Sequence, residues 1–221
     1  MKIMVMEEIM SRNEELAEAN RTEFAAKKIT VINVMASPGA GKTSLIMELI
    51  NRLSKELSFS VIEGDIASAI DAEKIEAMGI PVLQINTGGG CHLDANMIKE
   101  AVVELHPHDD SILFIENVGN LICPSTFDLG ETVRLVVASV PEGDDKPYKY
   151  ISMFENADVI ILTKTDILPY IRFDKDNFVK GVRALNQKAP IFEVSCTTGQ
   201  GLDELAGWLK GIVNTKKAVL K

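Results

Sequence analysis

A short glycine-containing segment between a strand-like run and a helix-like run constrains the fold of this chain most. Residues 36–43 read Ala-Ser-Pro-Gly-Ala-Gly-Lys-Thr, after the β-branched run 29–35 and at the start of an amphipathic stretch, 42–57. The glycines allow the backbone to curl so that successive N–H groups face one anion, and the helix start adds the positive end of its dipole. The segment therefore predicts a loop that binds nucleotide phosphates.

The side chains of this loop have separate expected roles. Lys42 would reach the outer phosphates as a point charge, and the Thr43 hydroxyl suits a Mg²⁺ ligand. The usual pattern begins with Gly where this chain has Ala36, but that position closes the strand and does not require a positive φ. The residues expected to contact the nucleotide here are Pro38, Gly39, Ala40, Gly41, Lys42, Thr43 and Ser44.

Short apolar runs alternate with helix-like stretches along the rest of the chain. The predicted strands are 29–35, 59–62, 81–85, 111–115, 132–140, 157–163 and 191–195, and the predicted helices are 42–57, 67–78, 94–105, 175–186 and 201–213. Continuous short apolar strands separated by helices are typical of a parallel sheet covered on both faces. We expect an α/β chain with a three-layer P-loop NTPase fold, a mostly parallel central sheet and helices on both faces.

The N-terminal residues have a different composition. Residues 7–28 are rich in Glu, Ala, Asn and Lys, and Ile9, Leu16 and Phe24 are widely spaced apolar points. This pattern predicts one or two helices with a modest apolar stripe, docked on the body or on a partner. We expect residues 1–28 to form an N-terminal helical extension and residues 29–221 to form the nucleotide-binding domain.

Composition excludes several classes of protein. The formal net charge is −9, which argues against a nucleic-acid footprint because phosphate neutralisation needs clustered Lys and Arg. No apolar run reaches the roughly 20 residues that span a bilayer, and the first ten residues lack the layout of a secretory signal. We expect a cytoplasmic protein without nucleic-acid or membrane partners. Its three cysteines do not suit a disulfide framework.

Acidic residues end two of the predicted strands. Glu116 follows the run 111–115, and Gly119 would let the backbone approach a terminal phosphate. Asp65 ends another strand and is a second plausible Mg²⁺ ligand. Together with Lys42 and Thr43, these two carboxylates form the predicted catalytic set, and Thr43, Asp65 and Glu116 form the predicted Mg²⁺ site.

A later strand ends in Thr163-Lys164-Thr165-Asp166. The Asp166 carboxylate can accept both N–H donors on the guanine edge, which adenine lacks, while the Lys164 stem lies along the base. Thr163 stands where G proteins most often carry Asn. Ser195 and Cys196 lie where a second base-contacting loop belongs, so the chain is expected to bind GTP.

An adjacent Cys-His pair follows three glycines in the segment Gly88-Gly89-Gly90-Cys91-His92. Cys123 lies four residues beyond Gly119, in the loop that would respond to the terminal phosphate. Thiolate and imidazole ligands suit Zn²⁺ or Ni²⁺ and suit Mg²⁺ poorly. The alternative is that both cysteines are packed thiols and that His92 is exposed or capped.

These motifs together resemble one family, the hydrogenase nickel-incorporation GTPase HypB. The resemblance covers most of the chain from residue 30 onward, and its Cys-His and Asn-Val-Gly-Asn segments are more specific than the phosphate loop. The matching segments are Ser37 to Thr43, Glu63-Gly64-Asp65, Gly89 to Asp94, Glu116 to Pro124 and Glu142 to Pro147.

The resemblance implies a cytoplasmic GTPase that helps to deliver nickel to the large subunit of nickel-iron hydrogenases. It implies a homodimer on GTP binding, a small nickel metallochaperone partner and a Ni²⁺ or Zn²⁺ site near the dimer interface. Cys91, His92 and Cys123 match the family's metal ligands. Some members carry an N-terminal cysteine motif or a His-rich tract for nickel, whereas residues 1–28 contain neither Cys nor His. Nickel storage is therefore not expected.

Three other functions fit part of the sequence. A urease accessory GTPase is another nickel-delivery switch, although the Gly-Cys-His and Asn-Val-Gly-Asn-Leu segments favour the hydrogenase factor. A P-loop kinase acting on a small molecule is a second alternative, against which the segment 163–166 argues. A metal-binding module with vestigial GTPase activity is the third. The absence of an obvious water-orienting glutamine predicts slow intrinsic hydrolysis to GDP and phosphate.

Overall fold

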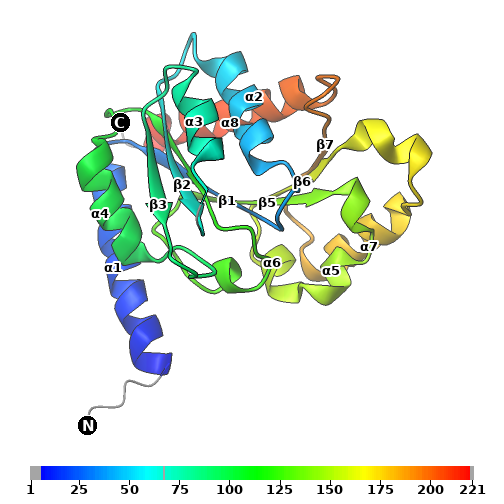
Figure 1. Cartoon of the computed structure of the whole chain (residues 1–221), viewed down its shortest axis with the longest axis horizontal. Coiled ribbons are helices and arrows are strands. Elements are labelled where there is room, and N and C mark those ends of the chain that lie inside the picture. Colours follow the sequence, from blue (N-terminus) through cyan, green and yellow to red (C-terminus); the bar gives the residue numbers. More distant parts are fainter. Residues whose placement is uncertain (1–5, 67, 220–221) are drawn as a thin grey trace.

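Seven parallel strands form the centre of the molecule in the computed structural model, which describes residues 6–66 and 68–219 (Figure 1). Their order is β3-β2-β4-β1-β5-β6-β7, and each neighbouring pair is parallel. The strands are β1 (Thr30–Ala36), β2 (Phe59–Asp65), β3 (Val82–Asn86), β4 (Ile112–Glu116), β5 (Val133–Ser139), β6 (Val159–Thr163) and β7 (Ile191–Glu193). The predicted sheet is confirmed.

Helices cover both faces of this sheet, as predicted (Figure 1). One apolar cluster joins β1 to α2, α3 and α8, and the clusters on the other face join the sheet to α1 and α4 and to α6 and α7. Successive strand residues point to opposite faces, so Ile32 packs in the first cluster and Val31 in another. The helices are α1 (Met6–Ala26), α2 (Lys42–Leu53), α3 (Ile70–Glu76), α4 (Ala95–Leu105), α5 (Lys146–Lys149), α6 (Ile151–Glu155), α7 (Lys175–Leu185) and α8 (Leu202–Val219).

Several element boundaries differ from the sequence predictions. Helix α2 ends at Leu53 and not at 57, and α8 continues to Val219 instead of ending at 213. The stretch 140–155, for which no helix was predicted, forms a short 3-10 helix and two short α-helices. The predicted helix 67–78 is observed as α3, Ile70–Glu76, and residue 67 lies outside the described residues, as do residues 1–5, 220 and 221. No helix in the described part of the chain is both long and apolar enough to cross a bilayer.

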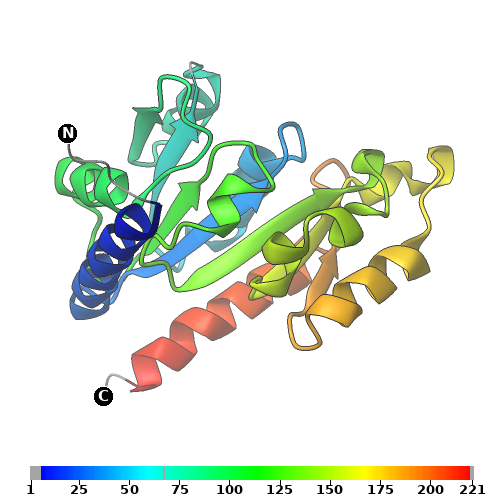
Figure 2. The same cartoon turned by 90° about the horizontal axis from the view of Figure 1, so that it is seen from below.

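The N-terminal segment forms one helix, α1, which lies beside α4 at one end of the sheet (Figures 1 and 2). Of the three apolar points predicted for its stripe, only Phe24 is buried against the body, whereas Leu16 is half-buried and Ile9 is exposed. The buried face instead runs through Asn13, Ala17, Asn20 and Phe24, whose spacing of three or four residues places them on one side of a helix.

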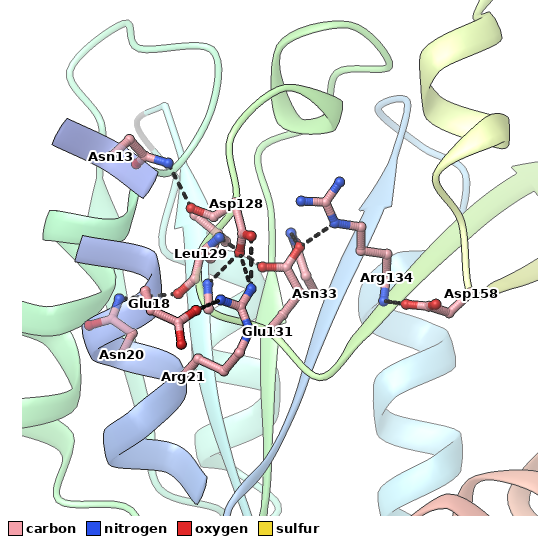
Figure 3. A network of polar contacts seen from close by, with 11 residues as sticks. Asn13, Glu18, Asn20, Arg21, Asn33, Asp128, Leu129, Glu131, Arg134 and Asp158 are labelled. Atoms are coloured by element: carbon pink, nitrogen blue, oxygen red, sulfur yellow. Dashed lines mark hydrogen bonds and ion pairs between the residues drawn. The ribbon is translucent and has the colours of Figure 1, made fainter. Parts of the chain in front are cut away.

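Two asparagines can lie on this buried face because backbone groups satisfy their amides. The Asn13 amide donates to the carbonyl of Asp128 at 2.8 Å and accepts from the N–H of Ala95 at 2.9 Å. The Asn20 amide donates to the carbonyls of Ala95 at 2.9 Å and Leu129 at 3.1 Å. Arg21 adds a bidentate ion pair with Asp128 (Figure 3). Helix α1 therefore ties the start of α4 to the loop before β5.

Candidate nucleotide and metal site

The predicted functional segments converge at one edge of the sheet. The strands β1, β2, β3, β4 and β6 are parallel, so the loops that follow them leave from the same edge. The glycine-containing segment 37–41 follows β1, the central strand of the order, and the acidic, Cys-His and Lys-Asp segments follow the other strands. The topology explains why segments far apart in sequence lie around one loop.

The phosphate loop has the backbone that its sequence predicted. Gly39 and Gly41 have φ angles of 74° and 100°, a region that side chains disfavour. Gly41 caps the start of α2, whose first residue is Lys42. Two bonds from the β6 end hold the loop in place: the Thr163 hydroxyl donates to the carbonyl of Ala40 at 2.7 Å, and the Lys164 amine donates to that of Gly39 at 2.6 Å.

The Lys42 and Thr43 side chains both face Glu116. The Thr43 hydroxyl donates to Glu116 Oε1 at 2.9 Å, and Lys42 Nζ lies 3.7 Å from the same oxygen. Glu116 is 3% exposed, and its burial raises the pKa of the carboxyl group while Lys42 and Thr43 oppose the rise. The three residues therefore form one buried polar unit beneath the phosphate loop.

Two further carboxylates, which the sequence analysis did not select, lie beside Glu116. Oxygen atoms of Glu63, Asp71 and Glu116 lie within 4.8 Å of one another. The register of β2 and β4 pairs Glu63 with Glu116, and the first turn of α3 supplies Asp71, which also makes an ion pair with Lys74. Glu63 could have been selected from the sequence, because it is an acidic residue directly before Gly64. Asp71 has no such local signal, since its position depends on how α3 packs.

This carboxylate cluster fits a Mg²⁺ ion by its chemistry. Burial, aided by the neighbouring carboxylates Glu116, Asp65 and Asp71, raises the pKa of Glu63 to about 8. One buried oxygen on Glu63 and one on Glu116 have no hydrogen-bond partner among the described residues. A cation would compensate both the mutual repulsion and the missing partners, and hard carboxylate oxygens are the ligands that Mg²⁺ prefers.

A cavity of about 260 Å³ connects the phosphate loop to these carboxylates. It is lined by Pro38, Gly39, Lys42, Glu63, Gly64, Asp65, Ile66, Asp71, Glu116, Val118 and Gly119. Asp65 lines this cavity, and its carboxylate accepts from the Ser68 N–H at 2.8 Å, but it is not one of the three clustered carboxylates. A phosphate chain and its counter-ion would both have polar partners here.

The residues predicted to contact the base lie on the segments that follow β6 and β7. The Ser195 hydroxyl donates to the Asp166 carboxylate at 2.6 Å, so the two predicted loops meet. Ser44 and Cys196 line a separate cavity of about 270 Å³ together with Met47, Glu48, Asn51 and Thr197. Burial raises the pKa of the Cys196 thiol to about 11, which keeps this sulfur protonated near neutral pH.

Cys91, His92 and Cys123 lie together although they come from two loops. Cys91 Sγ lies 2.9 Å from Cys123 Sγ and 3.6 Å from His92 Nδ1, and both cysteines are free. The His92 ring stacks on Phe127 with 3.8 Å between centroids, and burial lowers the pKa of the imidazole. Two sulfurs and a neutral imidazole nitrogen form a ligand set for a borderline-soft divalent cation, with room for a further ligand.

Comparison with known proteins agrees with this arrangement. Residues 30–193 match the family model described as CobW/HypB/UreG, nucleotide-binding domain. The chain is 47% identical over 203 residues to the hydrogenase maturation factor HypB of Escherichia coli, covering 92% of this chain and 70% of that protein. It is 40% identical to the hydrogenase/urease maturation factor HypB of Helicobacter hepaticus, covering 87% of this chain and 81% of the relative.

A solved structure extends the comparison to three dimensions. The crystal structure of HypB from Helicobacter pylori in complex with nickel superposes with a TM-score of 0.86 at 35% identity, covering 92% of this chain and 96% of that chain. The fold and the phosphate loop define a P-loop nucleotide-binding protein of the CobW/HypB/UreG class. Within that class, the chain belongs to the HypB family of hydrogenase maturation factors.

Proposed function

We propose that this protein is a GTP-hydrolysing switch that binds Ni²⁺ or Zn²⁺ and assists nickel insertion during the maturation of nickel-iron hydrogenase. The observation that carries the proposal is the position of Cys123. This sulfur lies 2.9 Å from Cys91, in a loop that begins at Glu116 and passes over the phosphate loop at Gly119. A change at the nucleotide would therefore displace a metal ligand.

Hydrolysis is assigned to the unit beneath the phosphate loop. Lys42 neutralises charge on the outer phosphates, and the N–H groups of residues 39–43 hold them in place. Thr43, Asp65 and Glu116 would hold Mg²⁺, and Glu63 and Asp71 lie close enough to Glu116 to contribute. Bound Mg²⁺ supplies neutralisation of the developing charge. The described lining of this cavity contains no glutamine to orient a water, which supports slow turnover.

Guanine selectivity is assigned to Asp166. Its carboxylate would accept the two N–H donors of the guanine edge, with Lys164 along the base and Ser195 and Cys196 on the facing loop. Thr163 uses its hydroxyl to bind the carbonyl of Ala40. Thr163 therefore supports the phosphate loop. Although it stands where G proteins commonly carry Asn, its side chain still donates a hydrogen bond to this loop.

The proposed partners follow from the family. We infer a homodimer on GTP binding, delivery of nickel to the hydrogenase large subunit, and cooperation with a small nickel metallochaperone. The Escherichia coli relative is a hydrogenase maturation factor, and the Helicobacter pylori relative was crystallised in complex with nickel. Urease maturation is a second candidate, because the Helicobacter hepaticus relative is named for both enzymes.

One experiment tests the central proposal. Ni²⁺ and Zn²⁺ affinities are measured with GDP and with a non-hydrolysable GTP analogue, while metal content and mass in solution are recorded for each species. We expect one Ni²⁺ or Zn²⁺ ion bound per chain. The affinity for this ion should differ between the GDP and GTP-analogue states, and the GTP analogue should produce a dimer. Equal affinities together with an unchanged mass would contradict the switch, and phosphate transfer to an added metabolite would favour a kinase.

A further inference from the structure

Asn120 links the end of β1, from which the phosphate loop leaves, to the Cys-His pair. Its backbone N–H donates to the carbonyl of Ala36, the last residue of β1, at 2.8 Å. Its side-chain amide donates to the carbonyl of Cys91 at 3.3 Å. The two contacts come from one residue of a loop that the nucleotide is expected to move, so a displacement at one end is carried directly to the other.

The preceding glycine makes this loop sensitive to the phosphate loop. A Cβ atom on Gly119 would lie 2.9 Å from Pro38 Cγ and 3.0 Å from Pro38 Cα, so the two backbones are already in close contact. Any shift of the loop toward a terminal phosphate must begin at this contact and continue into Asn120, its next residue.

Asn117, on the other side of Gly119, is fixed to the sheet. It is 1% exposed, and its amide donates to Asn33, a fully buried residue in the middle of β1, at 3.2 Å. Its side-chain carbonyl accepts from the N–H of Leu93 at 3.2 Å. Asn33 is in turn linked to the Glu131 network that α1 holds (Figure 3). Leu93 is therefore anchored to the rigid centre of the molecule.

The metal-binding pair thus lies between a fixed point and a point on the nucleotide-responsive loop. Leu93 is held by Asn117 and packs closely on Gly64. A Cβ atom on Gly64 would lie only 2.7 Å from the Leu93 side chain. Cys91 is held by Asn120. Movement of Asn120 relative to the anchored Leu93 would turn the intervening peptide units and change the directions of the Cys91 sulfur and the His92 ring.

We propose that Asn120 is the positioning residue that transmits the nucleotide state to the metal site, through its hydrogen bond to the Cys91 carbonyl. This inference rests on the proposed GTP-dependent switch and adds a second route beside Cys123. The two routes differ in an observable way: Cys123 responds because it belongs to the moving loop, whereas Cys91 responds only if the Asn120 amide holds it.

Two substitutions at Asn120 test the bond. N120A removes both side-chain contacts, and N120D keeps the acceptor that takes the Ile122 N–H at 2.8 Å while losing the donor to Cys91. The readout is the ratio of Zn²⁺ dissociation constants with GDP and with a non-hydrolysable GTP analogue. A ratio is used because the added carboxylate shifts affinity in both states. The matched control is N96A, which removes an exposed amide that, among the described residues, bonds only to Glu100 on α4.

We expect the wild-type ratio to fall in the usual range of roughly 5- to 150-fold and to move several-fold toward one in both Asn120 variants, which keep only the part that Cys123 carries. N96A keeps the wild-type ratio. A preserved ratio in both Asn120 variants overturns the inference, and so does loss in N120A with retention in N120D, because the Ile122 contact would then carry the effect. Wild-type protein that hydrolyses GTP and dimerises with the GTP analogue, but binds Zn²⁺ with the same affinity in both nucleotide states, overturns this inference alone. Protein that neither binds metal nor hydrolyses GTP contradicts the proposed function.

A measurement on the unaltered protein covers the case in which a variant does not fold. The side-chain NH₂ of Asn120, assigned by its loss in the N120D spectrum or by selective labelling, is followed by NMR in metal-free protein. We expect its hydrogen-exchange protection to differ between the GDP and GTP-analogue states. Equal protection in both states would overturn the inference.

Discussion

The phosphate loop and the Cys-His-Cys cluster are held by different kinds of interaction. The loop is one continuous segment, shaped by two glycines with positive φ and closed by the first turn of α2. The metal cluster joins residues 32 positions apart, on loops fixed by Asn117, Asn120 and the α1 asparagines. Local backbone preferences shape the first region, which two bonds from the β6 end then hold in place, whereas the second exists only when distant segments are correctly packed.

The largest expected effect separates hydrolysis from metal binding. Lys42→Ala removes the cation that faces the outer phosphates, and we expect the hydrolysis rate to fall roughly 100- to 1,000-fold, as for loss of one preorganised charge-stabilising donor. Metal affinity without nucleotide should stay within a few-fold, because the metal cluster does not use Lys42. The measurements are phosphate release and Zn²⁺ titration of the same preparation. A large loss of metal affinity would show that the two regions are not separately held.

Cys123→Ser tests the opposite separation, in which metal binding is impaired and hydrolysis is retained. We expect metal affinity to fall by at least the roughly 10- to 100-fold that loss of an outer-shell partner costs, because a first ligand is removed. GTP hydrolysis, measured in excess Mg²⁺ with a chelator selective for Zn²⁺ and Ni²⁺, should be unchanged. Cys196→Ser is the matched control, since Cys196 lies by the other cavity and should leave Zn²⁺ affinity intact. Retention of metal affinity in Cys123→Ser would remove this sulfur from the ligand set.

The pH dependence of metal binding should also distinguish the regions. The hydrogen bond with Cys123, aided by burial, raises the pKa of Cys91 above its ordinary value, so metal binding near neutral pH must displace a proton. Burial lowers the pKa of His92, which is therefore already neutral at pH 7. We expect Zn²⁺ affinity to rise by up to about tenfold per pH unit for each thiol proton released. Cys91→Ser should flatten this slope, and an unchanged slope would contradict the assignment.

The smallest expected effect concerns α1. Asn20→Ala leaves the buried carbonyls of Ala95 and Leu129 without that donor, which should lower the free energy of unfolding by about 1–3 kcal/mol. We expect metal affinity to fall a few-fold because α4 and the loop before β5 loosen, while nucleotide affinity is retained. Denaturant unfolding and parallel titrations measure both. A fall in nucleotide affinity larger than the fall in metal affinity would contradict this contrast, because the phosphate loop would then also depend on the packing of α1.

Much of this molecule was predictable from sequence because the signals are local. Apolar strands, the Gly39 and Gly41 backbone and the Cys-His motif each lie within a few consecutive residues, and the parallel sheet places their loops at one edge. The buried face of α1 was not predictable from its apolar residues, because Asn13 and Asn20 are satisfied only by backbone groups of distant segments. Asp71 was missed for a related reason, since the packing of α3 decides its approach to Glu116.

The sequence by itself determined the fold class and the position of the phosphate loop, because both follow from residue type and spacing over short distances along the chain. It also selected the three residues of the candidate metal site, with the help of the resemblance to HypB. Only the tertiary structure decided that Glu63 joins Glu116, that α1 holds two loops together, and that Asn120 spans Ala36 and Cys91. Those relations depend on register and packing between segments, where a hydrogen bond forms only if both partners arrive within about 3.5 Å.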